Sequence, residues 1–300
     1  MWQEMLRQIE QGNMKALARS ISFIENEHAS YEKFMQSLPG NNATKIIGIT
    51  GPPGAGKSTL TDALIGCMVG EGKKVGVLCV DPSSPFNLGA LLGDRIRMNE
   101  WYTNENVFIR SLATRGSMGG LHPKIIEIAD TMKAFPFDHI IIETVGVGQS
   151  EIEIAGLADI TIVVVVPESG DEVQTMKAGL MEIADIFVVN KADRPGADLF
   201  VKNLRLMLAP AFHHRKEQVP VLKTMATEKK GTRELYEAIL NQQNTTVPDR
   251  RYWLLAEKAW HLIKNKRMED ISKSDLKKKL ERSSHKDKEN FNLYRFVENL

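Results

Sequence analysis

The sequence has little cysteine and no long apolar run. Its 300 residues include only two cysteines, Cys67 and Cys79, one in an expected helix and one in an expected buried strand. We therefore expect buried free thiols rather than a disulfide or a metal-binding pair. The longest largely apolar run, Ile160 to Val166, is too short to cross a bilayer. The start of the chain lacks the pattern of a signal peptide, so we expect a cytoplasmic protein without a membrane partner.

An excess of charge of either sign is also missing. The chain has 39 Lys and Arg residues against 38 Asp and Glu residues, which gives a formal net charge of +1. This balance provides no overall positive field, so we expect no nucleic-acid partner.

Seven short runs rich in Val and Ile are separated mostly by stretches long enough for helices. Runs that are apolar at nearly every position are typical of parallel strands buried on both faces and joined by helical crossovers. We predict an α/β fold with a doubly wound, mostly parallel sheet of about seven strands, and ligands at the carboxyl ends of the strands. The expected strands are Ile46–Thr50, Val75–Val80, Val107–Arg110, His139–Glu143, Ile160–Val166, Ile186–Val189 and Val219–Leu222.

Segments with helical periodicity flank the strand-rich region. Apolar residues recur at helical spacing before a break at Pro39, and the strand pattern stops after about residue 248. We expect an amino-terminal helical extension over 1–42, the sheet-bearing P-loop domain over 43–245, and a helical segment over 246–300 that serves in dimerisation.

A phosphate-binding motif follows the first expected strand and precedes an expected helix, which is the context that a P-loop requires. Its glycines let successive N–H groups face one point, and the helix adds its positive end. Lys57 is expected to reach the β- and γ-phosphates, and the Ser58 hydroxyl to bind Mg²⁺. The expected phosphate-binding residues are Gly51, Pro52, Pro53, Gly54, Ala55, Gly56, Lys57, Ser58 and Thr59.

The base is predicted to be guanine, from Asn190, Lys191 and Asp193 at the end of a strand. The Asp193 carboxylate can accept hydrogen bonds from both N1–H and the exocyclic amine of guanine, and adenine offers no such pair of donors. Sites of this kind discriminate by roughly 10⁴–10⁵. A second base-binding loop is expected at 225–227, where Met225 stands in place of a usual serine, followed by Ala226 and Thr227.

Three carboxylates lie at or near expected strand ends: Asp81, Asp94 and Glu143. Such groups hold Mg²⁺ directly or through water, or orient the attacking water. Glu143 begins a Glu-Thr-Val-Gly sequence, a variant of the Asp-x-x-Gly switch, whose Gly146 N–H is expected to meet the γ-phosphate. Val147 rather than glutamine follows Gly146, and Gln149 is a candidate substitute. We therefore expect slow intrinsic hydrolysis that a partner accelerates.

Taken together, these motifs are similar to those of the MeaB/ArgK family, GTPases that accompany B12-dependent acyl-CoA mutases. The resemblance covers roughly residues 10 to 240. The matching sequences are Gly-Pro-Pro-Gly-Ala-Gly-Lys-Ser-Thr at 51–59, Val-Asp-Pro-Ser-Ser-Pro at 80–85, Leu-Gly-Asp-Arg-Ile-Arg-Met at 92–98, Glu-Thr-Val-Gly-Val-Gly-Gln-Ser-Glu at 143–151 and Asn-Lys-Ala-Asp at 190–193.

The resemblance implies a chaperone that binds GTP, GDP and Mg²⁺, associates with a mutase of the methylmalonyl-CoA mutase type, gates delivery of adenosylcobalamin and protects the mutase. It also implies a homodimer and an additional switch at 168–177, where Gln174 and Lys177 match. Two other functions stay open on the residues alone. One is a metal-insertion GTPase, which normally carries His or Cys clusters. The other is a kinase or ATPase of basic amino-acid transport.

Overall fold

The computed structural model describes residues 1–40, 43–81, 98–114, 121–146, 150–167, 178–211, 219–242, 248–268, 272–286 and 292–298. The chain divides into two compact units, Met1–Arg250 and Arg251–Leu300, and each is described by itself. The candidate residues Asp94 and Gln149 lie outside the described residues, as does the expected switch at 168–177. The domain limits expected from the sequence stay predictions.

The sheet of the first unit confirms the predicted α/β fold. Seven strands pair in the order β3-β2-β4-β1-β5-β6-β7, and every pairing is parallel. Their Val- and Ile-rich sequences are buried almost throughout, as parallel strands covered on both faces require. The strands are β1 (Lys45–Thr50), β2 (Val75–Asp81), β3 (Val107–Ala113), β4 (His139–Glu143), β5 (Ile160–Val165), β6 (Ile186–Val189) and β7 (Val221–Lys223).

One face of the sheet is covered by α4 (Lys57–Gly70) and α11 (Thr232–Gln242). Apolar side chains of both helices share a core with alternate residues of β1, β2, β5 and β6. A 3-10 turn, η1 (Asn99–Trp101), also contacts α4, where the Trp101 indole donates a 2.7 Å hydrogen bond to Asp62. Both cysteines are free, but only Cys79 is buried, because Cys67 lies on the half-exposed side of α4.

The other face is covered by a larger set of helices. Ile154 of α7 packs so closely on β1 that a Cβ at Gly48 would lie 2.6 Å from its side chain, and helix and strand can approach in this way only at a glycine. The helices of this face are α6 (Ile125–Lys133), α7 (Ser150–Leu157), α9 (Ala178–Ile183) and α10 (Ala197–Ala211).

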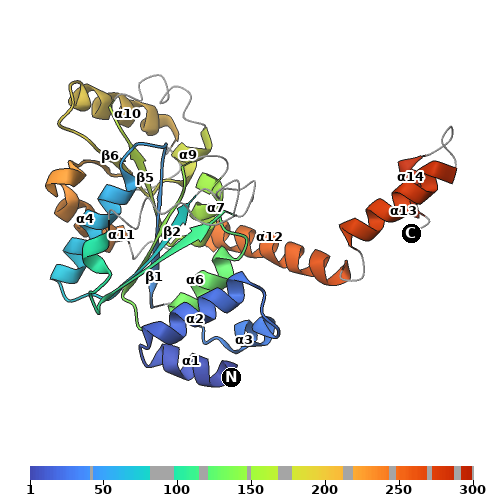
Figure 1. Ribbon diagram of the computed structural model, residues 1–300. Coiled ribbons are helices and arrows are strands. Elements are labelled where there is room, and N and C mark those ends of the chain that lie inside the picture. Colours follow the sequence, from blue (N-terminus) through green and yellow to red (C-terminus); the bar gives the residue numbers. More distant parts are fainter. Residues whose placement is uncertain are drawn as a thin grey trace. The chain divides into compact units, whose positions relative to one another are not determined.

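The amino-terminal residues form α1 (Trp2–Glu10), α2 (Met14–Glu25) and α3 (Tyr31–Ser37), as their periodicity predicted. The Asn13 side chain caps α2 by accepting a 3.1 Å hydrogen bond from the Ala16 N–H. Buried residues of all three helices share one core with α6 and with the sheet, and α2 lies along α6 (Figure 1). The extension is therefore part of the packed structure of the first unit.

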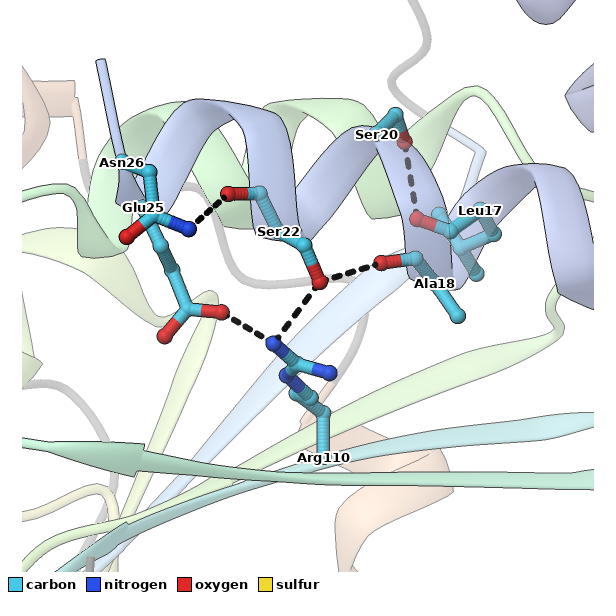
Figure 2. A network of polar contacts seen from close by, with 7 residues as sticks. All are labelled: Leu17, Ala18, Ser20, Ser22, Glu25, Asn26 and Arg110. Atoms are coloured by element: carbon cyan, nitrogen blue, oxygen red, sulfur yellow. Dashed lines mark hydrogen bonds and ion pairs between the residues drawn. The ribbon is translucent and has the colours of Figure 1, made fainter. Parts of the chain in front are cut away.

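A partly buried ion pair also connects α2 to the sheet. Arg110 of β3 donates to the carboxylate of Glu25 and, at 3.1 Å, to the Ser22 hydroxyl (Figure 2). The Ser22 hydroxyl in turn donates to the Ala18 carbonyl at 3.1 Å. Because Arg110 and Glu25 are both largely shielded from water, removing either partner would leave a poorly solvated charge.

After β7 and α11 the chain continues as α12 (Pro248–Arg267), α13 (Lys273–Lys286) and α14 (Leu293–Glu298). The prediction that the carboxyl-terminal segment is helical is therefore confirmed for the described residues. Ser272 caps α13 through a 3.0 Å hydrogen bond from the Asp275 N–H. In the described parts of the chain, no helix is long and apolar enough to span a membrane.

His139, at the amino end of β4, makes folding stability depend on pH. Burial lowers the pKa of His139 below its usual value; Lys73 acts in the same direction, and Asp138 and Glu71 oppose it. The unfolded state, with an ordinary histidine pKa of about 6.5, therefore binds the proton more strongly than the folded state. We expect the free energy of unfolding to fall as the pH drops through about 6.5 toward the folded-state pKa.

Denaturant unfolding at pH 7.5 and at pH 5.5 measures this effect. The His139→Gln variant should lose less stability between the two pH values than the unaltered chain. His28→Gln, at an exposed position, is the matched control and should keep the original dependence. An unchanged pH dependence in His139→Gln would contradict the prediction.

Candidate nucleotide-binding site

The residues predicted to bind nucleotide gather at one edge of the sheet. Parallel strands bring their carboxyl ends to the same edge, and β1, β2, β4, β6 and β7 each end in or beside candidate residues. The order β2-β4-β1 places Asp81, Glu143 and the phosphate loop on three adjacent strands.

The phosphate loop connects β1 to α4 and depends on its glycines. Gly51, Gly54 and Gly56 have φ values of 138°, 76° and 87°, a region that favours glycine. A Cβ at Gly51 would lie 2.0 Å from the Val164 carbonyl oxygen, and one at Gly56 would lie 2.4 Å from the amide nitrogen of Asn190. Pro53 and Gly54 form the exposed tip of the loop, and the helix that follows presents its N–H groups there.

Lys57, the first residue of α4, folds back over the loop. Its ammonium nitrogen donates to the carbonyl oxygens of Gly51 at 2.9 Å and Pro52 at 3.1 Å, and the residue is only 7% exposed. Gly146 closes over the same nitrogen, because a Cβ there would lie 2.5 Å from it. The predicted phosphate-binding lysine and the glycine of the predicted switch therefore adjoin each other.

Gly146 should tolerate no side chain. Its φ is 84°, and a Cβ would lie 2.2 Å from the Gly51 carbonyl oxygen as well as against Lys57. Gly146→Ala is therefore expected to displace Lys57 and lower GTP turnover about tenfold or more, since small displacements at a reacting centre reduce rates strongly.

Gly72→Ala is the matched control, because Gly72 has a φ of 75° and a Cβ added there would meet nothing within 4 Å. Both substitutions should lower stability by about 1–2 kcal/mol through the left-handed backbone. Turnover should fall only in Gly146→Ala, and equal turnover in the two variants would contradict the contact argument.

Glu143 lies against the first turns of α4. It is 4% exposed and accepts hydrogen bonds from the Ser58 hydroxyl at 2.6 Å and from the Thr61 hydroxyl at 3.1 Å. Next to it, the Thr144 hydroxyl contacts the Thr50 hydroxyl at 2.9 Å, which joins the end of β1 to the switch. Thr61 was not predicted from the sequence. The only feature of the sequence that points to Thr61 is its spacing: it places a hydroxyl three residues after Ser58, on the same face of the helix.

Asp81 is buried at the end of β2, two residues beyond Cys79, the register partner of Glu143. Ser58, Asp81 and Glu143 thus provide only oxygen donors beside an anion-binding loop, a set that fits Mg²⁺ together with phosphate. Among the residues that the structure describes, there is no group of three or more His, Cys, Asp or Glu side chains arranged to hold a metal ion by themselves.

At the other end of the site, Asn190 connects the phosphate loop to the second base-binding loop. Its side-chain nitrogen donates to the Ala55 carbonyl oxygen at 2.9 Å. Its oxygen accepts from the Thr224 hydroxyl at 3.0 Å and from the Ala226 N–H at 3.2 Å. Thr224 is a further residue that sequence reasoning missed. Lys191, in a left-handed conformation with φ of 56°, donates to the Gly54 carbonyl oxygen at 2.8 Å.

Asp193 and Thr227 are exposed beside this connection, and Met225 is half-buried. Met225 pairs with Lys230 through two backbone hydrogen bonds of 3.0 and 3.2 Å. The N–H groups of Met225 and Ala226 are therefore both engaged within the protein. The exposed Asp193 carboxylate is the group of this region that the sequence assigns to guanine.

Comparison with known proteins agrees with this geometry. The sequence model described as methylmalonyl-CoA mutase-associated GTPase MeaB matches residues 17–279. A putative GTPase of Pyrococcus horikoshii is 48% identical over 241 residues, covering 79% of this chain and 76% of the relative. The GTPase ArgK of Escherichia coli is 38% identical over 248 residues, covering 79% of this chain and 75% of ArgK.

A mouse protein, the mitochondrial methylmalonic aciduria type A homolog, is 32% identical over 255 residues, covering 78% of this chain and 61% of the mouse protein. Among solved structures, one described as an LAO/AO transport system kinase aligns with a TM-score of 0.67 and 28% identity, covering 98% of this chain and 94% of that one. A P-loop on a parallel sheet, relatives named as GTPases and a family match over most of the chain lead to one conclusion: the protein belongs to the MeaB family of GTPases.

Proposed function

We propose that this GTPase is a chaperone for an adenosylcobalamin-dependent acyl-CoA mutase of the methylmalonyl-CoA mutase type. In this role it gates loading of the B12 cofactor, protects the mutase, and works as a homodimer. The observation that carries the proposal is the match, over residues 17–279, to a family described as mutase-associated.

The phosphates of GTP fit the loop at 51–58. Its left-handed glycines turn backbone N–H groups toward one point, the start of α4 adds its positive end, and Lys57 moves from the carbonyl oxygens of Gly51 and Pro52 to the β- and γ-phosphates. Asp193 then recognises the guanine edge, while Asn190 holds the base-binding loop against the phosphate loop.

Hydrolysis is assigned to the carboxylates at the edge of the sheet. Ser58 and Asp81 would hold Mg²⁺, which would neutralise charge on the phosphates, and Glu143 keeps the Ser58 hydroxyl oriented. Gly146 adjoins the Lys57 ammonium group, and its N–H would meet the γ-phosphate there. Val147, rather than glutamine, follows Gly146, so the isolated chain hydrolyses GTP slowly and the partner completes the site.

Measurement of GTP turnover with and without a purified B12-dependent mutase tests the proposal. We expect slow turnover by the chain alone and an increase of at least about tenfold when the cognate mutase is added, as for other partner-completed GTPase sites. A parallel reaction with an unrelated acyl-CoA enzyme is the control.

Size-exclusion chromatography of the same mixtures, in GDP and in a non-hydrolysable GTP analogue, reports association. Failure to associate with, or respond to, any B12-dependent mutase in either nucleotide state would refute the chaperone role. Fast hydrolysis by the chain alone would refute partner activation.

A further inference from the structure

The contacts of Glu143 place one more residue in the machinery of this site. We propose that Thr61 is a positioning residue: its hydroxyl fixes the Glu143 carboxylate, which in turn orients the Ser58 hydroxyl toward Mg²⁺. The inference rests on the proposed role of this site in binding Mg²⁺ with a guanine nucleotide, and assigns Thr61 a part in metal affinity.

The first link is the contact between Ser58 and Glu143. The 2.6 Å separation of the Ser58 hydroxyl from Glu143 Oε1 is in the range of a charge-assisted O–H···O⁻ hydrogen bond. A hydroxyl has a single proton. Once that proton points to Glu143, the lone pairs of the Ser58 oxygen point elsewhere and are available to a hard cation. Outer groups that orient a ligand in this way are a regular part of metal sites.

The second link fixes the carboxylate itself. A carboxylate held by one oxygen can rotate, but Glu143 Oε2 also accepts a hydrogen bond from the Thr61 hydroxyl at 3.1 Å. Ser58 and Thr61 are three residues apart and therefore lie on the same face of α4. Both donors are carried by one rigid helix, and each addresses a different oxygen of the same carboxylate.

Thr61 also has a second acceptor. Its hydroxyl lies 3.0 Å from the Lys57 carbonyl oxygen, one helical turn back, and the residue is fully buried. An ionised carboxylate is the stronger acceptor, so the proton points to Glu143 while the carboxylate is in place. If Glu143 moves with the switch, the proton turns to the carbonyl oxygen, and no buried donor is left unsatisfied. Thr61 can therefore orient the Glu143 carboxylate and still allow it to move.

Two substitutions at Thr61 separate the hydroxyl from the methyl group. Thr61→Val keeps the shape and removes the hydroxyl, whereas Thr61→Ser keeps the hydroxyl. Thr131→Val is the matched control, because Thr131 is also fully buried in a helix and donates at 2.8 Å to the carbonyl oxygen one turn back. It lies on α6, and its hydroxyl contacts no carboxylate in the hydrogen bonds of the described structure.

The experiment titrates Mg²⁺ against each full-length variant with bound fluorescent GDP and follows the rate of GDP release. Thr61→Val should raise the half-saturating Mg²⁺ concentration about tenfold, at the lower end of the effect of removing an outer-shell partner. Thr61→Ser and Thr131→Val should stay within about twofold of the unaltered chain. GDP affinity in EDTA should be the same in all four proteins, which a general loss of structure would not allow.

Three results would overturn the inference alone: an unchanged Mg²⁺ dependence in Thr61→Val, an equal shift in Thr61→Ser, or an equal loss of GDP affinity with and without Mg²⁺. In each case the unaltered chain still binds GDP in a Mg²⁺-dependent way. If the unaltered chain binds no fluorescent GDP, the proposed function itself fails and the inference fails with it.

Discussion

Replacing Lys57 by alanine is expected to weaken binding of GTP and GDP by about thirtyfold or more, because loss of one partner of a buried charge pair costs about 2–5 kcal/mol. In the structure the ammonium group is buried and held by the carbonyl oxygens of Gly51 and Pro52. Those oxygens keep the lysine at the loop. In the proposed function the phosphates carry the negative charge that the ammonium group binds, so nucleotide binding depends on Lys57.

Equilibrium binding of fluorescent GDP and GTP analogues measures the effect. Lys73→Ala is the control, since Lys73 lies just beyond the other end of α4 in a partly exposed 3.2 Å ion pair with Asp138, and such pairs contribute little. Circular dichroism should show that both variants fold. Near-normal affinity in Lys57→Ala would contradict the assignment of the phosphate loop.

Exchanging Asp193 for asparagine is expected to change the preferred base from guanine to xanthine. The carboxylate accepts hydrogen bonds from N1–H and the amino group of guanine, whereas an asparagine amide faces that amino group with its own donor. Xanthine has a carbonyl oxygen there and accepts the new donor. Affinity for GTP should fall about 10²-fold or more and that for xanthosine triphosphate should rise, because an unpaired polar group in a base site is strongly rejected.

Competition of GTP and xanthosine triphosphate for one fluorescent nucleotide reads out this exchange. Asp198→Asn is the control: Asp198 is exposed on α10 and pairs with Lys223 at 2.7 Å. Unchanged preference for GTP in Asp193→Asn would refute base recognition by this residue.

The strands could be predicted because each is buried on both faces and has a nearly continuous apolar sequence. The positions at which the strands begin and end were harder to predict. β7 begins at Val221 rather than Val219, because Pro220 has no N–H to donate to a neighbouring strand. β3 continues past Arg110 to Ala113, since its half-exposed polar residues interrupt the apolar run while their backbone still pairs with β2.

The main parts of the candidate site could be proposed from the sequence, because the phosphate loop and the guanine motif are local patterns. Thr61 and Thr224 were not, because their partners Glu143 and Asn190 lie 82 and 34 residues away. The same holds for Arg110, which reaches Ser22 across 88 residues. A single hydroxyl or guanidinium group forms no periodic pattern in the sequence. Its role can be recognised only in the folded structure, where its partner lies next to it.

The strand order has a consequence for how the protein is made. β1 pairs with β4 and β5, both of which are synthesised long after it, whereas β2 and β3 are consecutive strands that pair with each other. Long-range parallel pairing is slow and forms late. The phosphate loop at the end of β1 therefore stays without its flanking strands while much of the chain is still being translated. Asn190 and Thr224, which contact each other in the folded chain, are synthesised later still. We therefore expect the nascent chain to bind nucleotide only after β7 has left the ribosome.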